Sequence, residues 1–87
     1  MKILEKCNVL LLEDDKEVAS AFIETLELYF KTIYFRTNIK DALETIRTKK
    51  IDVIMSDIHL EKENGLDFIT TLKSDENNTP IVILSGF

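Results

Sequence analysis

Short apolar runs alternate with segments of helical period along this chain of 87 residues, and this alternation limits the possible folds most strongly. The runs Cys7–Leu12, Ile51–Met55 and Ile81–Leu84 are nearly continuous in apolar residues, which is typical of strands buried on both faces of a parallel sheet. Thr32–Arg36 alternates apolar and polar residues, so we expect this strand at the sheet edge with one wetter face. The order β-α-β-α-β-α-β predicts an α/β fold with helices on both faces of the sheet.

The three segments between these strands repeat their apolar residues every three or four positions, as helices do when one face packs on a core. Asp15 and Asn38 are suitable N-caps for the first two helices, and Gly65 opens the third. The predicted inward faces are Val18, Ala21, Phe22, Thr25, Leu26 and Tyr29 in the first helix, Ile39, Ala42, Leu43 and Ile46 in the second, and Leu66, Ile69 and Leu72 in the third.

Composition excludes several classes of protein. A chain of this length forms one domain at most. Its 16 acidic and 11 basic residues give a net charge of −5, which opposes direct binding of nucleic acid by this segment. The single cysteine, Cys7, cannot form an internal disulfide, which fits a reducing cytosol. No apolar stretch approaches the roughly 20 residues that span a bilayer, and the N-terminus is unlike a signal peptide, so we expect a cytoplasmic protein without membrane association.

Polar residues follow three of the predicted strands at the point where each ends. Glu13, Asp14 and Asp15 follow the first strand, Asp57 follows the third, and Ser85 follows the fourth. These strand ends share one edge of a parallel sheet, where α/β proteins place their functional crevice. Two carboxylates about 4 Å apart repel by roughly 4 kcal/mol at an effective dielectric near 20, and a hard divalent cation would cancel this repulsion. The sequence therefore predicts a Mg²⁺ site at Asp14 and Asp57.

Together these motifs resemble the receiver domain of bacterial two-component response regulators. The likeness rests on the acids that end the first strand, on Asp57, on Gly65 eight residues later, and on the segment from Pro80 to Gly86. It covers almost the whole chain and implies a flavodoxin-like (CheY-like) parallel sheet. Residues 1–87 would then form a partial receiver domain, because family members continue through a further helix, a fifth strand and a last helix.

The resemblance also implies a role for each residue of the site. Asp57 would be the phosphoacceptor, taking a phosphoryl group from a sensor histidine kinase or a phosphotransfer protein. Magnesium would be held by Asp14 and Asp57, by Glu13 through water, and by the backbone carbonyl of His59. Ser85 would donate its hydroxyl to a phosphoryl oxygen. Such a protein serves phosphorelay signalling through an output module and is no enzyme, beyond assisting its own phosphorylation and dephosphorylation.

The chain departs from the family pattern at two points. Leu60 and Glu61 stand where the family usually has Met-Pro, which predicts a less rigid loop after Asp57. The family's phosphate-binding lysine has no counterpart, since Lys62 and Lys73 do not occupy the matching position. An alternative reading is therefore a degenerate receiver that acts as a phosphorylation-independent interaction module. The missing lysine favours this alternative, and the presence of Glu13, Asp14, Asp57 and Ser85 opposes it.

Other classes of site fit the sequence less well. The loop that begins at Asp57 superficially suggests a calcium loop, but Lys62 stands where that motif needs glycine. A nucleotide-binding domain would need a glycine-rich turn after the first strand, and an aspartyl-phosphate hydrolase would need Asp-x-Asp there; neither is present.

The fourth strand raises a question of association. Ile81–Leu84 is fully apolar, and an edge strand of this kind usually carries charge, proline or a bulge. We expect these side chains to be buried, and we expect the chain to form a homodimer, or exchange elements with a neighbouring copy, through this strand.

Overall fold

The computed structural model describes residues 5–58, 60 and 63–84, and it contains the predicted alternation of strands and helices. The elements are β1 (Asn8–Leu12), α1 (Lys16–Leu26), β2 (Thr32–Arg36), α2 (Ile39–Thr48), β3 (Val53–Asp57), α3 (Gly65–Ser74) and β4 (Ile81–Leu84). The predicted N-caps are confirmed, because Asp15 caps α1 and Asn38 caps α2. The third strand begins two residues later than expected and includes Asp57 as its last residue.

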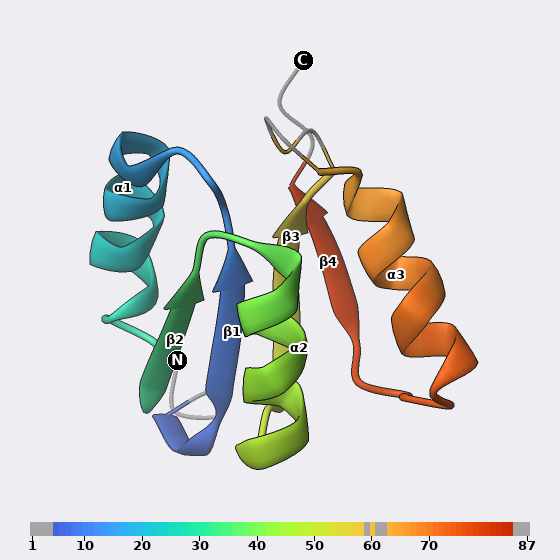
Figure 1. The fold of residues 1–87 in the computed structure, drawn as a ribbon. Coiled ribbons are helices and arrows are strands. Elements are labelled where there is room, and N and C mark those ends of the chain that lie inside the picture. The colour runs from blue at the N-terminus through green and yellow to red at the C-terminus, as the bar shows by residue number, and fades with distance from the viewer. Residues whose placement is uncertain (1–4, 59, 61–62, 85–87) are drawn as a thin grey trace.

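All strand pairs are parallel, in the order β2-β1-β3-β4, and Figure 1 shows their arrowheads pointing the same way. β2 lies at one edge, as its alternating pattern predicted. Leu12 at the end of β1 pairs with Ser56, and Asp57 at the end of β3 pairs with Leu84. The register therefore brings the ends of β1, β3 and β4 to the same edge of the sheet. The predicted α/β parallel fold is confirmed.

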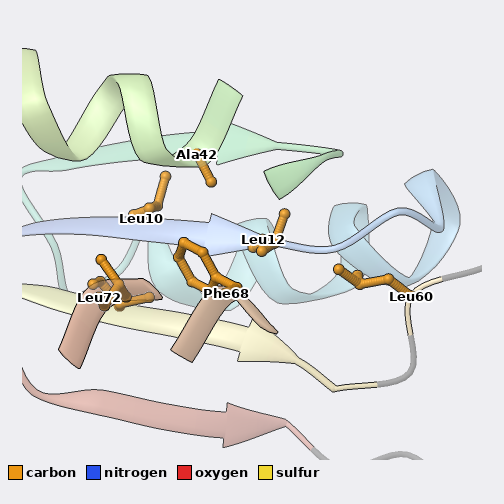
Figure 2. Close-up of a cluster of buried hydrophobic side chains, with 7 residues drawn as sticks. Leu10, Leu12, Ala42, Leu60, Phe68 and Leu72 are labelled. Carbon is orange, nitrogen blue, oxygen red and sulfur yellow. The ribbon is translucent and has the colours of Figure 1, made fainter. Parts of the chain in front are cut away.

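Both faces of the central strand β1 are buried, which explains its continuous apolar run. Leu10 and Leu12 lie on the face that α2 and α3 cover, where Figure 2 shows them among Ala42, Phe68 and Leu72. Val9 and Leu11 point to the other face, where α1 packs. Because every one of these β1 side chains is fully buried, the strand is fixed in both directions normal to the sheet.

The inward face of α1 differs from the prediction. Ala19 and Leu26 are buried, and Phe22, Ile23 and Phe30 pack with them against the sheet. The other predicted positions, Val18, Ala21, Thr25 and Tyr29, are exposed. The real stripe is displaced by one residue, about 100° around a helix of 3.6 residues per turn, and both stripes satisfy the helical spacing. The stripe that packs contains Ala19, which is fully buried in the same cluster as Val9 and Leu11 of β1.

Two further expectations about burial are wrong. Leu66 was expected to point inward but is 52% exposed, because Phe68 and Leu72 fill the space beneath α3. Val82 and Ile83 of β4 were expected to be buried but are 43% and 47% exposed. β4 pairs only with β3 among the described strands, so its outer edge and part of both faces have no cover there.

Within the described part of the chain, no helix has the length and apolar character needed to cross a membrane.

Candidate metal centre

Three carboxylates meet at the C-terminal edge of the sheet. Glu13 and Asp14 follow β1 directly, and Asp57 ends the neighbouring strand β3. One oxygen from each carboxylate lies within 4.8 Å of the other two. The arrangement follows from the parallel register, because Leu12 and Ser56 are paired and the next residue of each strand carries an acid.

The turn after β1 divides its three acids between two tasks. The Asp15 carboxylate accepts hydrogen bonds from the amides of Glu17 at 2.9 Å and Val18 at 3.2 Å, so it serves as the N-cap of α1. Glu13 is only 4% exposed, and its carboxylate accepts a hydrogen bond from the Asp15 amide at 3.2 Å. Its own amide donates to the carbonyl of Arg36 at 3.1 Å. Asp15 therefore caps α1, and Glu13 and Asp14 contribute their carboxylates to the cluster with Asp57.

The start of α3 packs directly on the backbone that follows Asp57. A Cβ at Gly65 would lie 2.6 Å from the Asp57 carbonyl oxygen and 2.6 Å from Cα of Ile58. The Gly65 amide donates to the carbonyl of Ile58 at 3.1 Å, and the side chain of Asn64 caps the helix by accepting from the Leu66 amide. Only glycine permits this approach, so the sequence spacing between Asp57 and Gly65 has a steric basis.

Electrostatics make the cluster unfavourable without a cation. Burial raises the pKa of the Glu13 carboxyl above its ordinary value of 4.5, and the nearby Asp14 and Asp57 raise it further, against the opposing effect of the Asp15 amide. A hard cation would cancel this repulsion, and carboxylate oxygens are the type of protein ligand that Mg²⁺ binds, together with water. The residues present therefore fit a divalent metal.

Two of the expected site residues, His59 and Ser85, lie outside the described residues. Sequence reasoning also missed one contact beside the site: the carboxylate of Glu63 accepts a hydrogen bond from the amide of Ile39 at the start of α2. Nothing in the local sequence signals a contact over 24 positions between a loop carboxylate and a helix terminus.

Comparison with known proteins agrees with this geometry. Residues 9–87 match the family model described as the response regulator receiver domain. The chain belongs to this family. The family predicted from the sequence is thus confirmed, and the four parallel strands with three helices are the part of the receiver fold seen here.

Relatives show how much of a longer protein such a segment occupies. The cell cycle transcriptional regulator CtrA of Caulobacter vibrioides is 40% identical over 83 residues, which cover 91% of this chain and 34% of the relative. The autoinducer 1 sensor kinase/phosphatase LuxN of Vibrio campbellii is 29% identical over 90 residues, which cover 99% of this chain and 10% of the relative. The chain thus spans about a third or less of the length of these relatives.

Solved structures give the same fold. The MaeR response regulator bound to beryllium trifluoride superposes with a TM-score of 0.87 at 30% identity, covering 94% of this chain and 69% of that one. The chemotaxis response regulator CheY4 of Vibrio cholerae has a TM-score of 0.78 at 23% identity, covering 88% of this chain and 66% of that one, and supports the fold alone.

Replacement of Gly65 by alanine should destabilise the domain. Adding a methyl group at an exposed helical glycine ordinarily stabilises by about 0.5–1 kcal/mol, whereas here the new Cβ meets backbone atoms that cannot turn aside. We expect Gly65→Ala to lower the free energy of unfolding in urea by about 1–3 kcal/mol. Thr70→Ala, at an exposed position of the same helix, is the control and should be nearly neutral. An unchanged or higher stability for Gly65→Ala would contradict the close approach.

Removal of the Glu13 charge should stabilise the metal-free domain at neutral pH. Because the pKa of Glu13 is raised, its carboxyl binds a proton more tightly in the folded state than in the unfolded chain. Proton binding at Glu13 therefore contributes fully to folding stability below about pH 4.5, and this contribution is lost as the pH rises through the folded-state pKa. Glu13→Gln should therefore melt at a higher temperature than the parent at pH 7 in EDTA, and the difference should disappear below pH 4.5. Glu24→Gln removes an exposed acid of α1 and should show no such gain.

Proposed function

We propose that this receiver domain accepts a phosphoryl group on Asp57 with Mg²⁺ bound beside it. The observation that carries the proposal is the convergence of the Glu13, Asp14 and Asp57 carboxylates at the ends of adjacent strands. The structures of family members, one of them bound to beryllium trifluoride, support the same assignment.

The reaction forms one bond and breaks one. A carboxylate oxygen of Asp57 attacks the phosphorus of a phosphohistidine on the partner, the new O–P bond forms, and the N–P bond breaks. The leaving imidazole nitrogen keeps the electron pair of that bond and takes a proton. Little covalent chemistry is required of the receiver, so it need only hold the acceptor in line and stabilise negative charge on the phosphoryl oxygens.

Each site residue has a defined role in this proposal. Asp57 is the acceptor and would also hold the metal together with Asp14 and the carbonyl of His59. Glu13 would act on the metal through water, and Ser85 would donate to a phosphoryl oxygen. The cation supplies positive charge to the phosphoryl oxygens when it is bound. The β1–β3 register keeps the acceptor oxygen of Asp57 close to the other acids, and the backbone contact with Gly65 fixes the chain behind it.

The domain would work as a phosphorelay component in the cytoplasm. It receives the phosphoryl group from a sensor histidine kinase or a phosphotransfer protein, controls an output module elsewhere in the protein, and catalyses nothing beyond its own phosphorylation and dephosphorylation. The alternative of a phosphorylation-independent interaction module is less well supported, because such a module has no use for three converging carboxylates, one of them with a pKa raised by burial and by its acidic neighbours.

Phosphorylation can be tested with a small acyl phosphate. We expect the longest soluble chain that contains these residues to gain the mass of one phosphoryl group when incubated with acetyl phosphate and Mg²⁺, and Asp57→Asn to abolish the gain. Asp14→Ala should slow the reaction strongly, because a metal carboxylate is lost. Asp15→Asn, which keeps a good N-cap, should react like the parent. A modification that survives in Asp57→Asn, or a parent that stays unmodified in intact-mass analysis, would contradict the proposal.

A second copy of the chain is the other partner that we propose. β4 leaves an edge and the side chains of Val82 and Ile83 uncovered in the described part of the chain, and an unpaired apolar edge is a template for another strand.

Light scattering after size exclusion tests this association. The 87-residue chain should form dimers or larger species at high micromolar concentration. Ile83→Lys should reduce association, because a charge on an edge strand opposes pairing. Leu28→Lys, at a 72% exposed position beyond α1, should not. A parent that remains monomeric at that concentration would rule out association through β4.

A further inference from the structure

The end of β2 and the start of α2 contact the turn after β1, which bears Glu13 and Asp14, and the loop that follows Asp57. The first contact is made by the carbonyl of Arg36, which accepts from the Glu13 amide at 3.1 Å. The second is made by the amide of Ile39, which donates to the Glu63 carboxylate at 2.9 Å. We call these two hydrogen bonds the α2 bracket. The bracket joins the turn after β1 to the end of β2, and the loop after β3 to the start of α2.

Glu63 is not needed as the cap of α2. Asn38 already fills that place, because its side chain accepts from the Asp41 amide at 2.9 Å. The Ile39 amide is another donor of the first turn that has no acceptor within the helix. The bond from Glu63 instead ties α2 to a loop 24 residues further along the chain.

The loop between Asp57 and α3 is held at three described points. Leu60 is buried in the core cluster, past Leu12 at the end of β1 (Figure 2). Glu63 is held on α2, and Gly65 packs against the backbone of Ile58. The absence of the family's Met-Pro predicts a less rigid loop, and these contacts are the restraints on it among the described residues. Of the three, only the Glu63 contact crosses to α2 through a side-chain hydrogen bond.

We propose that Glu63 is a positioning residue for the acceptor site. Its hydrogen bond to α2 fixes the loop that leaves Asp57 and thereby the direction of the Asp57 carboxylate toward Glu13 and Asp14. The carboxylate of Glu63 is not itself a ligand in this proposal. The expected effect of Glu63 on metal binding rests on the proposed function, whereas the hydrogen bond that restrains the loop does not require a metal.

Three variants separate positioning from simple helix capping. Glu63→Ala removes the acceptor, Glu63→Gln keeps an oxygen acceptor without the charge, and Asn38→Ala removes the cap of the same helix without touching the loop. The probe is Mg²⁺ alone, titrated calorimetrically into the chain well below its melting temperature. The second readout is the exchange rate of the Gly65 amide, measured by NMR in the metal-free chain, because that amide donates to Ile58 within the restrained loop.

We expect Glu63→Ala to weaken Mg²⁺ binding roughly tenfold, as loss of a residue that orients metal ligands typically does, and to speed exchange at Gly65. Glu63→Gln should restore both values, and Asn38→Ala should melt earlier while keeping both. If Asn38→Ala changes them as much as Glu63→Ala, Glu63 is only a second cap and the proposal is wrong. If Glu63→Gln is as impaired as Glu63→Ala, charge and not position is responsible, which also overturns it.

The two readouts also keep this inference distinct from the proposed function. A parent chain that binds no Mg²⁺ defeats the metal site, but faster exchange at Gly65 in Glu63→Ala would still support the restraint on the loop. A parent that binds Mg²⁺ together with a Glu63→Ala variant that is unchanged in both readouts keeps the metal site and eliminates the role of Glu63.

Discussion

The parallel register of β1 on β3 is the constraint on which the acceptor site depends. Leu12 pairs with Ser56, so the first residue after β1 and the last residue of β3 come to the same point of the sheet edge. A slip of one residue would turn the buried side chains of β1 to the wrong faces, and both of its faces are filled. The cores on the two sides of the sheet therefore fix the position of Glu13 relative to Asp57.

The site uses stability that the core provides. Burying Glu13 beside two other acids costs free energy in the metal-free domain, as its raised pKa indicates, and the cost is tolerated because β1 is held by fully buried leucine and valine side chains. Gly65 differs from Glu13 in this respect, because the absence of a side chain is what lets α3 pack on the backbone after Asp57.

The sequence predicted the elements well because each carries a local signal. Continuous apolar runs marked the inner strands, Asp15 and Asn38 marked helix starts, and acids after strands marked the site. The face of α1 was wrong because two stripes one residue apart both have helical spacing, and only contact with the sheet decides between them. Exposure of Leu66 depended on whether Phe68 filled the space beneath α3, which is a question of volume that periodicity does not answer.

The sequence did not predict the contact between Glu63 and α2, because this contact joins two segments that no local sequence pattern connects. It also differs physically from the contact at Gly65. Backbone atoms in van der Waals contact cannot separate unless α3 moves as a whole, whereas one hydrogen bond contributes only about 0.5–1.5 kcal/mol net and can be exchanged for water. The loop after Asp57 thus has a fixed end at α3 and a releasable attachment at α2.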